Sequence, residues 1–247
     1  MPADPYLDLM KRILTNVIYQ DPPHEVAWHA GTGFDAGRRA SGLDWPSVAH
    51  TMVGLDRLDN LQHCVEQVIA DEIPGDLIET GVWRGGVTIF MRALLAAYDQ
   101  KDRTVWVADS FEGIPDSGSG HPRDRAIALD RFNDVLAVPV AEVEENFRRY
   151  GLLDDQVRFL PGWFDTTLPA APIERLAVLR LDGDLYGSTM DGLVHLYPKV
   201  SVGGFVIVDD YVISACREAV HDYREAHGVT EEMVRIDDCG VYWRRTS

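Results

Sequence analysis

Four aspartates end two apolar segments in the second half of the chain, where charged side chains are able to bind ligands. RLAVLRLDGD ends with Asp182 and Asp184, and GGFVIVDD ends with Asp209 and Asp210. Runs of β-branched residues are typical of strands buried on both faces, as in a parallel sheet. Because neighbouring strands lie ~5 Å apart, we expect Asp182, Asp209 and Asp210 to converge at one edge of a sheet.

Carboxylates placed so close together point to a bound cation. Three of them within hydrogen-bonding range of one another cannot all stay ionised unless a cation neutralises them. Oxygen ligands with no nearby His or Cys favour Mg²⁺, Mn²⁺ or Ca²⁺ over zinc. The alternative for Asp210 is to cap the helix that follows it. The alternative for Asp184 is a hydrogen bond within its own turn.

The ends of two earlier strands carry residues suited to a nucleoside ligand. GDLIETG leads into the turn ETGVWRGG, in which Gly81 and Gly85 allow the backbone to approach a ligand closely. TVWVADSF leads to Asp109, whose carboxylate is suited to the vicinal hydroxyls of a ribose. The turn lacks the GxGxxG pattern of NAD enzymes. Glu79 before the first glycine indicates a ligand with amine or hydroxyl donors rather than a pyrophosphate.

Strand and helix patterns alternate along the chain in a way that would bring these strand ends together. The expected strands are 75–81, 104–111, 156–162, 175–184 and 203–210, and the expected helices between and after them are 86–98, 140–151, 188–200 and 216–228. A hairpin-like pair around Cys239 and Gly240 follows. This alternation predicts an α/β fold with a doubly wound parallel sheet, which binds ligands beyond the carboxyl ends of its strands.

The first part of the chain carries helix patterns and no strand pattern. We interpret residues 1–74 as an N-terminal helical cap that belongs to the same domain as the core at 75–247. Helices are expected over 4–20 and about 54–70, with irregular structure at 21–50. The apolar face of the first helix can pack on its own domain or on a second subunit, and we favour the second subunit.

The stretch 112–135 is long for a connection between elements, and it is a candidate lid or binding loop. Specificity is expected to depend on this loop and on the cap. Met52, His121 and Leu136 are candidates for the wall of the pocket or for its surface. His50 and His121 lie in segments that can fold over the site.

Composition restricts the partners. The 247 residues suffice for one α/β domain with a sizeable core, and 40 acidic against 23 basic residues give a net charge of −17. Such a surface repels nucleic acid and anionic lipid, so we expect neither as a partner. No signal pattern or membrane-length apolar run is present. The separated Cys64, Cys216 and Cys239 indicate buried thiols in a reducing cytoplasm rather than disulfides or a zinc site.

Linked motifs along the chain resemble those of the macrocin O-methyltransferase family, metal-dependent class I methyltransferases that act on sugar hydroxyls in natural-product biosynthesis. They are IETGVWRGG, VADSFEGIP, LRLDGDLYGST and GGFVIVDDY, preceded by HTMVGLDRLDNLQHC. The resemblance spans nearly the whole chain. It implies a Rossmann-like seven-stranded sheet whose last strand runs antiparallel. It also implies S-adenosyl-L-methionine as donor, Mg²⁺, a glycoside of an antibiotic or similar metabolite as acceptor, and a homo-oligomer.

The resemblance also implies roles for single residues. The cofactor would be bound by Glu79, Thr80, Gly81, Gly85, Asp109, Ser110, Gly162, Trp163 and Asp182. The metal would be bound by Asp182, Asp209 and Asp210. Trp163 would flank the adenine, although it suits a core position equally well. Arg84 would meet the carboxylate of the cofactor or offset Glu79.

One departure from catechol-type relatives concerns the base. Those enzymes place a lysine shortly after the aspartate of the fourth strand, whereas this chain has Asp184, Leu185 and Tyr186 there. A carboxylate must therefore accept the proton, and we expect Asp182 to do so, with Asp184 as the second candidate. A phenolic or catechol acceptor is the main alternative function. An NAD-type oxidoreductase and a catalytically inactive scaffold are weaker alternatives.

Overall fold

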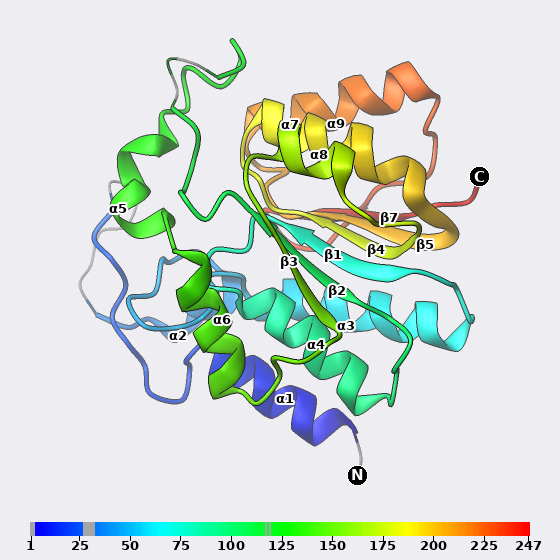
Figure 1. The fold of residues 1–247 in the computed structure, drawn as a ribbon. Coiled ribbons are helices and arrows are strands. Elements are labelled where there is room, and N and C mark those ends of the chain that lie inside the picture. Colours follow the sequence, from blue (N-terminus) through cyan, green and yellow to red (C-terminus); the bar gives the residue numbers. More distant parts are fainter. Residues whose placement is uncertain (1–2, 27–32, 117, 119) are drawn as a thin grey trace.

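The computed structural model describes residues 3–26, 33–116, 118 and 120–247, so part of the predicted irregular segment 21–50 lies outside it. Seven strands form one sheet in the order β3-β2-β1-β4-β5-β7-β6 (Figure 1). They are β1 (Asp76–Thr80), β2 (Val105–Asp109), β3 (Val157–Pro161), β4 (Leu176–Leu181), β5 (Val200–Val208), β6 (Val234–Arg235) and β7 (Val241–Arg244). The first five strands pair in parallel, and β7 runs antiparallel to both of its neighbours. The predicted α/β sheet with an antiparallel last strand is confirmed.

Helices cover both faces of the sheet (Figure 1). One face carries α1 (Ala3–Leu14), α3 (Leu55–Ala70), α4 (Gly86–Ala97) and α6 (Val140–Arg149), and the other carries α7 (Phe164–Ala170), α8 (Tyr186–Leu196) and α9 (Ser214–His227). Connections hold the short elements α2 (Ala36–Ser41), η1 (Leu129–Phe132), α5 (Asn133–Leu136) and η2 (Tyr197–Lys199). Helix α7 was not predicted, because FDTTLPA is short and contains Pro169. The two faces therefore bury two apolar cores, one on each side of the sheet.

Helix α1 is shorter than predicted and packs within its own chain. It ends at Leu14 because Asn16 adopts a left-handed backbone (φ 52°) and its side-chain amide donates to Asp21 at 2.7 Å. Leu7, Met10 and Leu14 are buried against the core that α4 shares. The preference for a second subunit as the partner of this helix is therefore wrong.

A buried arginine fixes the path of the chain between α1 and α3. Arg39 is 1 % exposed, and its guanidinium donates to the carboxylates of Asp21 at 2.8 Å and Asp44 at 2.9 Å and to the carbonyl of Thr15 at 2.8 Å. Charge-assisted hydrogen bonds of this kind are stronger than those between neutral groups. The cap segment that follows α2 therefore has a defined position although it forms no strand.

The register of the sheet places charged residues in one row. Glu79 pairs in register with Arg180, and Arg180 pairs with Ile207. Side chains two residues apart point to the same face of a strand. Asp182 and Asp209, two positions beyond Arg180 and Ile207, are therefore expected on the same side as Arg180. This is the face on which α3 and α4 pack, because Ile207 belongs to their core.

Two expectations from composition can be compared with the structure. The three cysteines are free, but only Cys64 and Cys216 are buried, whereas Cys239 is half-buried and lines a cavity. The expectation of three buried thiols is therefore corrected for Cys239, which lies in a turn between two short strands. No helix in the described part of the chain is both long and apolar enough to cross a membrane.

Candidate active site

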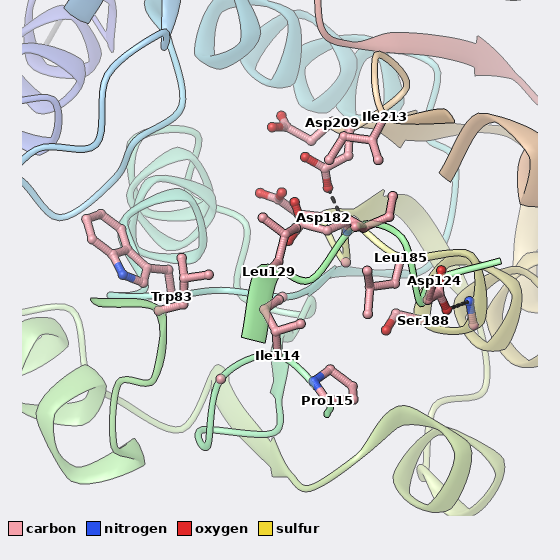
Figure 2. A pocket seen from close by; sticks show the side chains of 18 of the residues that line it. Trp83, Ile114, Pro115, Asp124, Leu129, Asp182, Leu185, Ser188, Asp209 and Ile213 are labelled. Carbon is pink, nitrogen blue, oxygen red and sulfur yellow. Dashed lines mark hydrogen bonds between the residues drawn. The ribbon is translucent and has the colours of Figure 1, made fainter. Parts of the chain in front are cut away.

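A cavity of about 1020 Å³ lies at the carboxyl ends of the parallel strands, where a doubly wound sheet binds its ligands. Figure 2 shows Asp182 and Asp209 on one side of it and Ile114 and Pro115, from the segment after β2, on the other. Its lining includes these predicted site residues: Gly81, Asp109, Ser110, Trp163, Asp182, Asp184, Asp209 and Asp210. The predicted wall residues Met52, His121 and Leu136 line it as well.

Four residues predicted to contact the cofactor are not among the described residues that line this cavity. They are Glu79, Thr80, Gly85 and Gly162. Glu79 is 1 % exposed, and Arg180 is its ion-pair partner. Gly85 faces Val143 of α6, which a Cβ at Gly85 would approach to 2.6 Å. Arg180 pairs with one carboxylate oxygen of Glu79, and the other, buried oxygen has no hydrogen-bond partner among the described residues, so the contact of Glu79 with the cofactor stays a prediction.

Arg84 fastens the cap to the turn after β1. Its guanidinium donates to the carbonyl oxygens of Pro46 at 3.2 Å and Ala49 at 2.9 Å. The role of offsetting Glu79 falls to Arg180 instead. Arg84 is not among the described residues that line the cavity, and its contact with the carboxylate of the cofactor stays a prediction.

The two histidines predicted to lie over the site differ in position. His50 shares a 2.7 Å hydrogen bond with the hydroxyl of Tyr150, and burial lowers the pKa of His50 to about 4. It lies away from the cavity lining. His121 lines the cavity and stacks on the ring of Tyr186, with 4.2 Å between ring centroids. Of these two histidines, His121 is the one that lines the cavity.

Backbone N–H groups hold the carboxylate of Asp109 at the end of β2. It accepts hydrogen bonds from Val82 at 2.7 Å, from Phe111 at 2.8 Å and from Trp83 at 3.4 Å. Burial raises the pKa of Asp109, and these bonds oppose that rise. The hydroxyl of Ser110 donates a fourth hydrogen bond at 3.3 Å. These bonds fill the about four lone-pair sites of an ionised carboxylate, and those from Trp83 and Ser110 are the longest.

Asp182, Asp209 and Asp210 converge as predicted. One carboxylate oxygen from each lies within 4.8 Å of the other two. Burial raises the pKa of Asp182 and of Asp210, and the neighbouring carboxylates raise both further. A divalent cation would relieve this repulsion, and an all-oxygen donor set suits Mg²⁺. The residues present therefore fit a metal ion of that class.

The structure also separates the alternatives for Asp184 and Asp210. Helix α9 begins at Ser214, and the carboxylate of Asp210 accepts the backbone N–H of Asp184 at 2.9 Å rather than capping that helix. Burial, followed by the charges of Asp182 and Asp209, raises the pKa of Asp184 to about 8. Among the described residues, no hydrogen bond or ion pair engages the carboxylate of Asp184. It therefore lines the cavity without such a partner, and it is able to accept a proton above about pH 8, or at lower pH where a bound cation lowers its pKa.

Two buried arginines contact the acidic residues, and neither is among the site residues predicted from the sequence. Arg180 of β4 pairs with Glu79, Asp182 and Asp209, and Arg57 of α3 also pairs with Asp209. Arg180 has a signal in the sequence, because a lone arginine inside the apolar strand LAVLRL requires buried anionic partners. Arg57 has no such signal, since its partner lies far away along the chain.

The candidate lid at 112–135, described except at 117 and 119, is docked on α8 and α9. Asp124 is 3 % exposed and accepts the backbone N–H groups of Tyr186 at 2.6 Å and Gly187 at 3.0 Å. Figure 2 shows Asp124 beside Leu185 and Ser188. Arg123 pairs with Asp222 of α9 at 2.6 Å. These contacts hold the loop as one wall of the cavity.

Replacing Gly81 by Ala is expected to cost at least ~4 kcal/mol of the free energy of unfolding, the range of severe steric damage. Gly81 has φ 86°, and a Cβ there would lie 1.7 Å from the carbonyl oxygen of Asp182. Gly151→Ala is the matched control, because Gly151 has φ 68° with no atom within 4 Å of its Cβ position. That control is expected to lose about 1–2 kcal/mol. Equal losses in urea denaturation would mean that the close approach is unimportant.

Comparison with known proteins gives matches over nearly the whole chain. Residues 3–245 match the family model described as Macrocin-O-methyltransferase (TylF). The 8-demethyl-8-(2,3-dimethoxy-alpha-L-rhamnosyl)-tetracenomycin-C 4'-O-methyltransferase of Streptomyces olivaceus is 62 % identical over 245 residues, which is 99 % of this chain and 94 % of that protein. The Mycinamicin III 3''-O-methyltransferase of Micromonospora griseorubida is 58 % identical, over 98 % of this chain and 96 % of that protein.

A solved structure is similar to the same extent. The structure of the O-methyltransferase NovP is 56 % identical in sequence and superposes with a TM-score of 0.95. The match covers 99 % of this chain and 100 % of that one. The likeness thus includes the cap and the final hairpin as well as the central strands.

Proposed function

The chain belongs to the macrocin O-methyltransferase family and is an O-methyltransferase, and on that premise we propose that it methylates a sugar hydroxyl of a glycosylated natural product. The donor in this proposal is S-adenosylmethionine, and the reaction depends on Mg²⁺. One observation carries the proposal. A single cavity contains both Asp109, at the strand end expected to bind the ribose of a nucleoside, and the acidic cluster of Asp182, Asp209 and Asp210.

The donor would lie over the ends of β1, β2 and β3. S-adenosylmethionine, when bound, supplies a methyl group that its sulfonium already activates. Gly81 would let the backbone approach the donor. Asp109 lines the cavity, and its carboxylate would accept the ribose hydroxyls in place of its long hydrogen bonds from Trp83 and Ser110. Trp163 is 39 % exposed and lines the cavity, which suits a side chain that stacks on adenine rather than one in the core.

Mg²⁺ would be held by Asp182, Asp209 and Asp210. When bound, it would lower the pKa of a hydroxyl group in its coordination sphere. The proton of that hydroxyl must pass to a base in the cavity. We assign this role to Asp184, because Arg180 already pairs with Asp182, which is also needed as a metal ligand. This assignment reverses the order expected from the sequence.

The acceptor would lie between the cap and the segment after β2. Apolar side chains from both line the cavity: Leu43, Trp45, Met52, Ile114, Pro115, Ile127, Leu129 and Leu136. Burial of apolar surface favours binding in proportion to the area removed from water. This wall supports an acceptor whose sugar carries a large apolar aglycone, and it would give a free sugar few contacts.

The first test is binding of S-adenosylmethionine by calorimetry, followed by a vicinal-diol glycoside with and without Mg²⁺. We expect the donor to bind without the metal and the glycoside to bind strongly only with it, because both diol oxygens can then enter the coordination sphere. Mass spectrometry of the glycoside would detect the added methyl group. Failure to bind the donor would contradict the proposal, and metal-independent methylation would contradict the role of Mg²⁺. Preferential methylation of a competing catechol would support the phenolic alternative.

A further inference from the structure

One arginine of the cap joins three segments at the edge of the acidic cluster. Arg57, in the first turn of α3, is 6 % exposed and lines the cavity. Its guanidinium donates to the carboxylate of Asp209 and, at 3.3 Å, to the carbonyl oxygen of Gly42. Its Nε lies 3.0 Å from a carboxylate oxygen of Asp237, in the turn between β6 and β7. Arg57 therefore contacts a proposed metal ligand, the final hairpin and the cap at once.

The cap is fitted closely around this guanidinium. Gly42 has φ 65°, and a Cβ there would lie 2.3 Å from Nη2 of Arg57 and 2.4 Å from the backbone nitrogen of Gly54. Gly42 and the next residue, Leu43, both line the cavity. We call the cap residues that line the cavity where the acceptor would bind, Gly42 and Leu43 among them, the acceptor wall. A shift of the Arg57 side chain would thus move this wall.

The local charges allow Arg57 to stay in place beside a bound cation. Ion pairs connect four carboxyl groups to two guanidinium groups: Glu79, Asp182, Asp209 and Asp237 with Arg57 and Arg180. Asp184 and Asp210 line the cavity beside this set. A divalent cation would bring the positive charges to four, beside six carboxyl groups that are able to ionise. A carboxylate that ligates a metal commonly accepts hydrogen bonds as well. Asp209 can therefore serve both the metal and Arg57.

We propose that Arg57 is a positioning residue that couples occupancy of the metal site to the order of the acceptor wall, an inference that rests on the metal site of the proposed function. Asp209 loses orientational freedom when it ligates a cation. Arg57 then donates to an acceptor of fixed direction, and through Arg57 the carbonyl of Gly42 is fixed as well. Coupling between two sites is reciprocal, so an ordered wall also strengthens metal binding.

Calorimetric titration with Mn²⁺ tests the proposal on the wild type and on Arg57→Met and Arg57→Lys. We expect the affinity for Mn²⁺ to fall about 10–100-fold in Arg57→Met, the usual effect of losing a group that orients a metal ligand. Arg57→Lys should fall less, because lysine keeps the charge but not the planar fork of donors. Unchanged or tighter binding of Mn²⁺ by Arg57→Met would overturn the proposal.

Arg84→Met is the matched control. Arg84 also fastens the cap, through Pro46 and Ala49, but it is not a partner of Asp209. Its loss should change the affinity for Mn²⁺ far less than the loss of Arg57. Equal effects would attribute the change to a loosened cap in general and overturn the specific role of Arg57.

Hydrogen exchange of the wild type needs no substitution and keeps the test valid if Arg57→Met fails to fold. Addition of Mn²⁺ should slow amide exchange at 39–45 and 237–240 and leave α6 unchanged. If Mn²⁺ binds but amide exchange at 39–45 is unchanged, the coupling between the metal site and the acceptor wall is overturned, whereas the metal site itself is not. A wild type that binds no Mn²⁺ would overturn the metal site, and with it both proposals.

Discussion

Replacing Asp184 by Asn is expected to lower the rate of methyl transfer by about 10²–10⁴-fold, the usual contribution of a general base. The amide has nearly the same shape as the carboxylate but cannot accept the proton of the acceptor. The backbone should tolerate the change, because Asp184 has φ 57° and Asn adopts left-handed conformations more readily than most residues. Single-turnover kinetics with saturating donor would measure the chemical step itself.

Asp182→Asn is the control that separates the base from the metal ligand. Asp184→Asn should retain affinity for Mn²⁺ and for S-adenosylmethionine, because its carboxylate is not among the three that converge. Asp182→Asn should lose both metal affinity and turnover. If Asp184→Asn instead turns over normally while Asp182→Asn binds metal and is inactive, Asp182 is the base, as the sequence alone suggested.

The fold was predictable because its strands are apolar and its turns are marked by glycine. All five parallel strands and the final hairpin overlap the ranges that the apolar runs predicted, since strands buried on both faces leave a continuous signal. The boundary before β5 is wrong, because β5 begins at Val200, within the predicted helix 188–200. Two errors concern helices whose ends or existence depend on single residues. Asn16 ends α1 early through its side-chain bond to Asp21. Helix α7 contains a proline and is too short to show a period.

The candidate site was predictable only as far as strand ends reveal it. Asp182, Asp209 and Asp210 follow apolar runs, and the parallel register does bring them together. A position at a strand end does not show whether the side chain is buried or which partner it pairs with. Glu79 occupies a strand end in the same way, yet it points at Arg180 and lies outside the cavity lining. Arg57 and the wall residues of the cap depend on tertiary contacts between distant segments.

Replacing Arg180 by Met is expected to destabilise the protein by about 3–5 kcal/mol at pH 8, the typical cost of removing one partner from a buried ion pair. Methionine has a similar length and is apolar, so the change leaves little cavity. It does leave the buried carboxylate of Glu79 without a cation, and Asp209 with Arg57 alone. Urea denaturation in the presence of EDTA would measure the loss without a contribution from bound metal.

The loss should depend on pH. Burial already raises the pKa of Glu79 in the native state above its ordinary value. Between the two pKa values the native state binds more protons than the unfolded state, so stability falls as pH rises through that range. Removing Arg180 raises the native pKa further, because Arg180 is the charge that lowers it. The deficit of Arg180→Met relative to the wild type should therefore be smaller at pH 5 than at pH 8.

A second substitution distinguishes unpaired charge from lost packing as the cause. In Glu79→Gln combined with Arg180→Met, both members of the pair are uncharged while their shapes are nearly kept. Replacing a buried ion pair by uncharged groups that pack well is often neutral or stabilising, so the double variant should recover much of the stability that Arg180→Met lost, and its deficit should depend less on pH. If the double variant is as unstable as the single one, and the loss does not vary with pH, then Arg180 stabilises the sheet through packing and the carboxylates do not require its charge.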